Sequence, residues 1–392
     1  MKAIINTKLI MEDGIIWDGA LLYEGDKIVA ADWKDKVEVP KDAEIIDANG
    51  LYTAPGLIDI HNHGCREYWF YENPQYVSDF FIKHGVTTVL PTFYHIMSKE
   101  DMKNGAAKIR EISKHGTGKI MDGLYMEGPF MSLSGSSSSQ IKWHGAVCKE
   151  DYAELIESFG DMVRVWAIDP NRENIEEFMA YAKEHTPHAI FAHGHSKAGF
   201  EQIKALKHYG VKVRTHITDS GRPIGRAQGT PGAGGDEFAL YDPDMYAELI
   251  CDQSAVHVEP GLMKLFVKIK GAERICLISD HTTCGENNYK NDEEGGIWYG
   301  PDLNYDDIGW LAGSLMTIDN AVKNIMTHTP TGLCQAIRMA SLTPAELLGI
   351  DNRVGSLKKG KTANLILIDD AVNIKKVILE GETAVENGEI VL

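Results

Sequence analysis

Two histidines, His61 and His63, stand at the end of a short apolar run that begins with a Pro-Gly pair. The run covers residues 55–60 (Pro-Gly-Leu-Ile-Asp-Ile), and its composition is typical of a buried β-strand. Residues two apart in a strand point to the same face, so both imidazoles are expected to project together from the strand's C-terminal end. Two neutral imidazoles supply half of a tetrahedral metal site. The alternative is a pair of surface histidines on a loop.

Other side chains that can bind a metal or carry a proton follow later apolar runs. They are Glu127 before Gly128-Pro129, His193 and His195 around Gly194, His216 after Arg214-Thr215, and Asp280 before His281. His193 and His195 share a strand parity, so spacing alone leaves both as candidates. Each of these residues could be a surface or structural group by itself. As a set they predict a metal site.

The elements expected to position these residues alternate between strand and helix. Strand-like runs occupy residues 57–63, 86–91, 119–127, 163–168, 189–195, 211–217, 250–256 and 274–280, and helix-like runs such as 174–185 and 199–209 lie between them. Eight strands with helical crossovers predict an α/β protein with a (β/α)8 TIM barrel. The C-terminal strand ends of a barrel converge on one face, where the candidate residues and the Ser-rich stretch 134–139 are then expected.

Both ends of the chain are rich in short β patterns. Turn pairs such as Asp13-Gly14, Gly25-Asp26 and Asn49-Gly50 separate the first group, and Glu380-Gly381 separates strand-like runs near the end. We therefore predict a small β-sandwich domain made of residues 1–54 plus 349–392, and a catalytic barrel of residues 55–348.

Composition narrows the class of protein. The chain has 57 acidic and 39 basic residues, a formal net charge of −18, which argues against nucleic acid or an anionic membrane surface as a partner. Its six cysteines form no C-x-x-C pair, which fits reduced thiols. Without a signal-like start or an apolar run of about 18 residues, a cytoplasmic location and a small-molecule substrate are expected.

Several motifs in this order resemble the amidohydrolase superfamily, and within it the N-acetylglucosamine-6-phosphate deacetylases. The resemblance covers nearly the whole chain. It rests on Pro55-Gly56-Leu57-Ile58-Asp59, Met126-Glu127-Gly128-Pro129-Phe130, Gly194-His195-Ser196, Thr215-His216, Ser279-Asp280, Leu311-Ala312-Gly313-Ser314 and the run from Gly355 to Leu365. Other branches of the superfamily commonly use a carboxylated lysine as the bridging ligand, whereas Glu127 resembles the branch that uses glutamate.

The resemblance implies one metal ion held by Glu127, His195 and His216, which leaves a coordination position open. Because His61 and His63 are present, a second ion is also expected, with Glu127 bridging and Asp280 touching the second ion. His193 is then expected to be structural. Zinc is the first expectation for these one or two divalent ions, although the ligand types also suit iron, manganese or cobalt.

Catalytic and substrate-binding roles also follow from the resemblance. Asp280 resembles the family's general base, which takes a proton from the attacking water and passes it to the departing amine. His144 resembles a histidine that hydrogen-bonds the oxyanion, with a surface loop position as the alternative. His257 resembles a substrate contact after the seventh strand, and could equally be a satisfied core histidine.

Residues after His216 depart from the family pattern, which typically reads Asn-Ala-Met. Asp219 and Ser220 stand there, and a carboxylate a few ångströms from a phosphate costs about 4 kcal/mol at 4 Å and an effective dielectric constant near 20. Arg222 and Arg226 could offset that charge or simply form a solvated basic loop. The family often forms dimers in which a loop completes the partner's pocket, so a homodimer is expected.

Three functions remain open from the sequence. The first is a metal-dependent deacetylase that releases acetate from an N-acetyl amino sugar, with N-acetylglucosamine-6-phosphate as the expected substrate. The second is an amidohydrolase that acts on a different amide, such as a non-phosphorylated one, an N-acyl amino acid or a cyclic imide. The third is a binding protein without catalytic activity on a degraded barrel.

Overall fold

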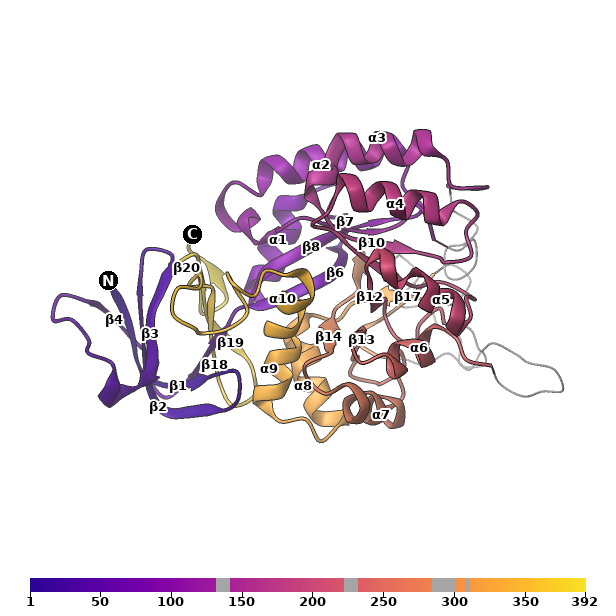
Figure 1. The fold of residues 1–392 in the computed structure, drawn as a ribbon. Helices are drawn as coiled ribbons and strands as arrows, with labels where there is room; N and C mark the ends of the chain where they lie inside the picture. The colour runs from indigo at the N-terminus through magenta and orange to yellow at the C-terminus, as the bar shows by residue number, and fades with distance from the viewer. Residues whose placement is uncertain (132–141, 222–231, 284–299, 307–309) are drawn as a thin grey trace.

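A computed structural model describes residues 1–131, 142–221, 232–283, 300–306 and 310–392. Within these residues the chain forms a β-rich unit, which carries both chain ends, and an α/β barrel (Figure 1). The five cysteines in this part of the chain are free thiols. No helix found among the described residues is long and apolar enough to cross a membrane.

The β-rich unit is one hydrogen-bonded sheet of nine described strands, in which the two ends of the chain meet where β5 pairs antiparallel with β18. Apolar side chains from both halves, among them Ile4, Leu21 and Leu367, share one core. The described strands are β1 (Lys2–Ile10), β2 (Ile15–Glu24), β3 (Lys27–Trp33), β4 (Glu44–Asp47), β5 (Tyr52–Pro55), β18 (Leu365–Ile368), β19 (Ile374–Leu379), β20 (Glu382–Glu386) and β21 (Glu389–Ile390).

Hairpins in this unit follow their turn residues. Glu380 and Gly381 connect β19 to β20 with φ values of 51° and 81°, and two positive φ values match the hairpin turn whose twist suits the flanking strands. Gly381 is required there, because an added Cβ would lie 1.9 Å from the carbonyl oxygen of Gly25. The split of the chain near residues 54 and 349 stays a prediction.

The barrel is built from eight parallel strands in chain order. They are β6 (Leu57–Arg66), β8 (Val86–Tyr94), β9 (Leu124–Glu127), β10 (Val163–Ile168), β11 (Ile190–His193), β12 (Val211–Arg214), β13 (Tyr246–Ile250) and β14 (Ile275–Ile278), and β15 (His281–Thr283) continues the eighth. β14 pairs with β13, whereas β15 pairs with β6, so the eighth strand closes the ring. The predicted TIM-barrel fold is confirmed.

A buried carboxylate reinforces this closure. Asp59 on β6 accepts hydrogen bonds from the hydroxyl of Ser279 at 2.5 Å, from the Ser279 amide at 3.2 Å and from the Asn62 side chain at 2.9 Å. The amide of Asp280 donates to the carbonyl of His61 at 3.0 Å. These bonds fix strand eight beside strand one, which places Asp280 next to the two histidines of β6.

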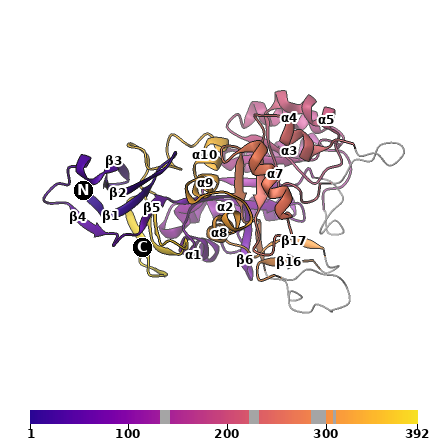
Figure 2. The same cartoon turned by 90° about the horizontal axis from the view of Figure 1, so that it is seen from below.

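Helices surround the strands. They are α1 (Pro74–Lys83), α2 (Lys99–Ile112), α3 (Lys149–Phe159), α4 (Ile175–His185), α5 (Phe200–Leu206), α6 (Gly235–Tyr241), α7 (Pro260–Lys270), α8 (Ile318–His328), α9 (Leu333–Met339) and α10 (Leu342–Leu348). Figure 2 shows α8, α9 and α10 between the nine-stranded sheet and the rest of the barrel. Short strands β7 (Tyr68–Trp69), β16 (Leu303–Tyr305) and β17 (Leu311–Ser314) extend the sheet.

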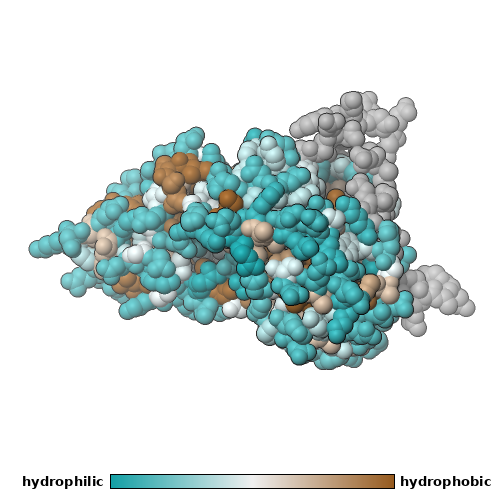
Figure 3. Space-filling model, turned by 90° about the horizontal axis from the view of Figure 1, so that it is seen from above, coloured by the Kyte–Doolittle hydropathy of each residue, from teal (hydrophilic) through white to brown (hydrophobic). Residues whose placement is uncertain are grey.

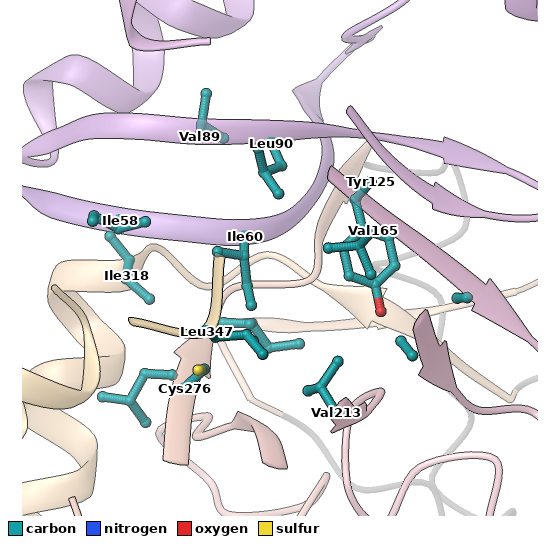
Figure 4. Packing of buried hydrophobic residues seen from close by; sticks show 14 of the residues in the cluster. Ile58, Ile60, Val89, Leu90, Tyr125, Val165, Val213, Cys276, Ile318 and Leu347 are labelled. Carbon is teal, nitrogen blue, oxygen red and sulfur yellow. The ribbon is translucent and has the colours of Figure 1, made fainter. Parts of the chain in front are cut away.

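The main core lies between the barrel strands and these helices. Figure 4 shows Ile58 of β6 beside Ile318 of α8, and Ile60 pointing toward Leu347 of α10, all of them nearly inaccessible to solvent. Because residues alternate along β6, the side chains of Asp59, His61 and His63 take the opposite face. The surface in Figure 3 is mostly hydrophilic, with hydrophobic residues in separate patches. Because the apolar residues of β6 pack on one face of the strand, its polar residues point into the interior of the barrel.

The seventh and third strands differ most from their predicted bounds. The seventh strand is Tyr246–Ile250 rather than 250–256, so His257 lies beyond a turn and not at a strand end. The third strand begins at Leu124 and not at 119, because a 3-10 turn at Gly116–Ile120 and Gly123, with φ 130°, interrupt the run.

Candidate metal centre

Six buried side chains from five barrel strands meet at the C-terminal face. His61 and His63 belong to β6, Glu127 is the last residue of β9, and the other three follow directly or closely on strand ends: His195 after β11, His216 after β12 and Asp280 between β14 and β15. Each is at most 8% exposed. Polar groups buried to this extent require hydrogen-bonding, charged or metal partners.

One group of three surrounds a single oxygen of Glu127. Glu127 Oε1 lies 3.0 Å from His195 Nε2 and 2.9 Å from His216 Nε2. The two Nε2 atoms are 3.0 Å apart. We call this set, Glu127, His195 and His216, the Oε1 group.

A second group meets the other oxygen of the same carboxylate. Glu127 Oε2 lies 3.1 Å from His63 Nε2 and 3.6 Å from His61 Nε2. Asp280 Oδ1 lies 3.3 Å from His63 Nε2 and 3.5 Å from His61 Nε2. We call His61, His63, Glu127 and Asp280 the Oε2 group. Glu127 therefore stands between the two groups and presents one oxygen to each.

These donor sets fit divalent cations. Ligand atoms bound tetrahedrally at about 2.0–2.1 Å are about 3.3 Å from one another, close to the separations seen in both groups. In each trio, Glu127 with His195 and His216 and Glu127 with His61 and His63, the ligand atoms lie within 4.8 Å of one another. Among the described residues His61 Nε2 has no hydrogen-bond partner, although it is fully buried beside two carboxylates. A metal ion would satisfy it.

In two of the imidazoles Nδ1, the nitrogen away from Glu127, has a hydrogen-bond acceptor. His61 Nδ1 lies 3.1 Å from Glu248 Oε2, and His216 Nδ1 lies 3.3 Å from the carbonyl oxygen of Asp219. Both partners are acceptors, so Nδ1 carries the proton in each ring. The lone pair of Nε2 is thereby turned toward Glu127, the arrangement that metal-binding histidines commonly show.

Charges in the centre favour a bound cation. Burial alone would raise the pKa of Glu127, but His61, His195 and His216 outweigh it and hold that pKa well below its usual range. The pKa of Asp280 is also lowered, because His61 and His63 outweigh its burial. Both carboxylates are therefore ionised around neutral pH. Against the effect of burial, Glu127 and Asp280 raise the pKa of both His61 and His63, so protons compete with a metal for these rings.

Three of the six residues have left-handed backbone. The φ values are 45° at His195, 29° at His216 and 47° at Asp280, and each such conformation costs about 1–3 kcal/mol for a residue with a Cβ. The turn at His195 also separates it from His193. His193 ends β11 and lies against Gly235, whereas His195 leaves the strand and reaches Glu127. Shared parity would have predicted the same direction for both.

The other predicted residues are distributed differently. His257 Nδ1 lies 2.6 Å from Asp219 Oδ2, and Ser220 is partly buried next to that pair. His144 is exposed on the loop before α3 and has no described contact with the centre. Arg222 and Arg226 lie outside the described residues, as does the Ser-rich stretch.

Two buried polar residues at the centre were missed by the sequence analysis. Glu248, on β13, bonds His61 Nδ1 and accepts from the His216 amide at 3.2 Å. Its signal was a charge inside the apolar run from Tyr246 to Ile250. His95 follows β8, is 2% exposed and has its ring centroid 6.1 Å from that of His195. Its position after a strand that ends at Tyr94 could have indicated it.

Comparison with known proteins points to one family. An amidohydrolase family model matches residues 307–384. An N-acetylglucosamine-6-phosphate deacetylase of Haemophilus influenzae is 28% identical over 97% of this chain and 98% of its own length. A putative N-acetylgalactosamine-6-phosphate deacetylase of Escherichia coli K12 is 35% identical over 41% of this chain and 92% of its own length.

Solved structures show the same architecture over the whole chain. The crystal structure of N-acetylglucosamine-6-phosphate deacetylase from Pasteurella multocida superposes with a TM-score of 0.84 at 25% identity, and the match covers 97% of this chain and 99% of that one. The predicted resemblance is confirmed, and the chain belongs to the amidohydrolase family.

Proposed function

We propose that this protein is a metal-dependent deacetylase that hydrolyses N-acetylglucosamine-6-phosphate to acetate and the amino sugar phosphate. The observation that carries the proposal is the placement of buried Glu127 between two groups of buried imidazoles at the C-terminal face of the barrel. Curated relatives of nearly the same length and fold are named for this reaction. Hydrolysis of an amide bond is the class of chemistry common to all these proteins.

The metal would be held by Glu127, His195 and His216, and a second ion by His61, His63 and Asp280 with Glu127 shared. A divalent ion at this place supplies Lewis-acid polarisation of the amide carbonyl and lowers the pKa of water. Zinc is our first choice because nitrogen and carboxylate ligands in tetrahedral geometry suit it, and iron, manganese and cobalt are the alternatives.

Asp280 is the proposed general base. Its carboxylate is ionised, is held against the two histidines of β6, and has a backbone that strand eight fixes. It would accept the proton of water as the oxygen adds to the amide carbonyl carbon. The same proton would pass to the amine nitrogen as the carbon–nitrogen bond breaks, so that a neutral amine and acetic acid form, and the acid gives up its remaining proton to solvent as acetate leaves. His144 is the proposed hydrogen-bond donor to the oxyanion, and a change in the loop before α3 would have to bring it there.

Pairing of Asp219 with His257 bears on the phosphate. The sequence predicted a repulsion between Asp219 and a substrate phosphate. In the structure the Asp219 carboxylate is 2.6 Å from His257 Nδ1, and with Asp252 and Asp280 it raises the pKa of His257 to about 9 against the effect of burial. The pair then carries no net charge, so the predicted repulsion is largely offset. His257 and Ser220 are the proposed substrate contacts, together with Arg222 and Arg226, and Asp219 is proposed to contribute to substrate binding through His257.

The alternative is an amide that differs in its sugar or lacks the phosphate. The relative with the highest identity quoted above is named for N-acetylgalactosamine-6-phosphate, which makes the C4 epimer a specific competitor. A cytoplasmic location and a homodimer complete the proposal. Sedimentation equilibrium would decide the oligomeric state.

Acetate release by the purified protein tests the function. The substrates are N-acetylglucosamine-6-phosphate, its C4 epimer, unphosphorylated N-acetylglucosamine and an N-acetyl amino acid, each with metal content measured in the same preparation. We expect the highest kcat/KM with N-acetylglucosamine-6-phosphate, and loss of turnover after chelation. Equal rates with and without the phosphate would reject the proposed preference for a phosphorylated sugar. Turnover of none of these compounds by metal-loaded protein would reject the deacetylase.

A further inference from the structure

Asp219 connects two functional parts of the site through different atoms. Its backbone carbonyl accepts from His216 Nδ1 at 3.3 Å and from the Arg214 guanidinium at 3.1 Å. Its side chain lies 2.6 Å from His257 Nδ1. Because the metal-side contact uses the backbone alone, a change of the side chain alters, among the described contacts, only the one with His257.

The backbone amide and one ring nitrogen of His257 have hydrogen-bond partners, whereas its other ring nitrogen has none among the described residues. Its amide donates to the Asp252 carboxylate at 2.9 Å, and its side chain is 1% exposed. Nδ1 is committed to Asp219, while Nε2 has no hydrogen-bond partner among the described residues. A buried polar nitrogen without a partner is unfavourable, so a bound ligand that bonds it recovers that free energy.

We propose that Asp219 is a positioning residue for His257: its carboxylate holds the Nδ1 proton and so fixes the ring with Nε2 turned toward the substrate. The substrate's identity rests on the proposed function, but the Asp219–His257 contact does not. The three carboxylates that raise the pKa of His257 to about 9 keep its ring protonated at neutral pH. Nε2 is then a donor, and the substrate group that meets it is an oxygen acceptor.

The first test does not depend on catalysis. Histidine labelled with 15N, in the full-length protein, reports the His257 Nδ1 proton, and a His257→Gln variant assigns its signal. We expect a slowly exchanging, hydrogen-bonded Nδ1 proton in the wild type, lost in Asp219→Ala and retained in Asp370→Ala, which removes an exposed carboxylate from the β-rich unit. A wild-type ring without a proton on Nδ1, or a signal that persists in Asp219→Ala, would overturn the proposal.

The second test is a double-mutant cycle with the best substrate found above. Loss of a partner that orients a functional histidine costs about 10–100-fold, so Asp219→Ala should lower kcat/KM by that factor, and Asp219→Asn, which keeps the shape, by less. In the His257→Ala background, Asp219→Ala should have no further effect, because it acts through the ring. Metal content should equal that of the wild type in every variant.

Additive losses in the cycle would show that Asp219 acts independently of His257, and would refute the positioning role. Loss of metal from Asp219→Ala would also refute it, since the effect would then pass through His216. An absence of deacetylase activity in the wild type would reject the proposed function instead, and the labelled-histidine measurement would still decide whether Asp219 fixes the ring.

Discussion

The two halves of the candidate centre, the Oε1 group and the Oε2 group, place their histidines beside Glu127 in different ways. His61 and His63 stay within the regular strand β6 and depend only on alternation, whereas His195 and His216 lie just beyond strand ends in left-handed backbone. The Oε1 group is also tighter, at 2.9–3.0 Å, than the Oε2 group, at 3.1–3.6 Å. Both histidines of the Oε1 group thus have strained backbone, whereas in the Oε2 group only Asp280 does.

Removing the residue that both halves share should have the largest effect. Glu127→Gln keeps the shape but leaves one oxygen and no charge, so both groups should lose metal and kcat/KM should fall by about 10³-fold or more, which is about 4 kcal/mol. Acetate release and elemental analysis measure this. Full metal content in Glu127→Gln would show that the carboxylate does not bridge the halves.

Asp280→Asn should come next. Loss of a general base typically costs about 10²–10⁴-fold, and the effect should fall on kcat, because proton transfer is part of the reaction step. Steady-state kinetics on metal-loaded protein give the value. Unchanged kcat would remove Asp280 from its proposed role, whereas a parallel loss of metal would make it chiefly a ligand of the Oε2 group.

Single histidine changes should separate the halves. We expect two ions per chain in the wild type and one in His61→Asn or His195→Asn, with kcat/KM lowered by about 10²-fold or about 2.7 kcal/mol in each. His193→Asn is the matched control from the same strand, and its metal content should stay at two. If His61→Asn kept the wild-type count, the Oε2 group would hold no ion of its own.

Glu248→Gln should weaken metal binding by the Oε2 group more than metal binding by the Oε1 group. The substitution removes the charge that orients His61 Nδ1, so the affinity of the Oε2 group for metal should fall by about 10–100-fold. Competition with a chromophoric chelator measures this. Because Glu248 also accepts from the His216 amide, a smaller loss is expected at the Oε1 group, and equal losses would contradict the difference between the halves.

As the pH falls, the Oε2 group should lose its metal ion before the Oε1 group does. This is the smallest of the expected effects. Both histidines of the Oε2 group have raised pKa values, whereas in the Oε1 group burial lowers the pKa of His195 and only that of His216 is raised. A proton that must be displaced weakens metal binding about tenfold for each pH unit below the pKa. Metal content against falling pH should show two steps, and the first should be absent from His61→Asn.

Much of the scaffold was predictable because local rules decide it. Turn residues such as Glu380-Gly381 define the hairpins, and apolar runs of strand length define most barrel strands. The seventh strand was misplaced because buried Glu248 interrupts its apolar pattern, and the prediction shifted to residues 250–256, which are apolar only at their two ends. A buried charge is tolerated there only because His61 and His216 bond it, which the sequence of one strand does not reveal.

The residue types of the centre were predictable from the sequence, but the directions of its side chains were not. Strand-end placement identified Glu127, His195, His216 and Asp280, yet parity would have aimed His193 and His195 alike. The left-handed turn at His195 separates them, and no local pattern specifies that turn for a histidine. The Asp219–His257 bond joins residues 38 positions apart and likewise depends on tertiary packing.

The pairing of β5 with β18 has a consequence for synthesis on the ribosome. β5 leads directly into the strand that carries His61 and His63, but its antiparallel neighbour is among the last segments to emerge. Until then that side of the sheet can attract other chains, as unpaired strand sides do. A protein shortened before Leu365 would therefore be expected to aggregate, even though every residue of the six-membered cluster had already been made.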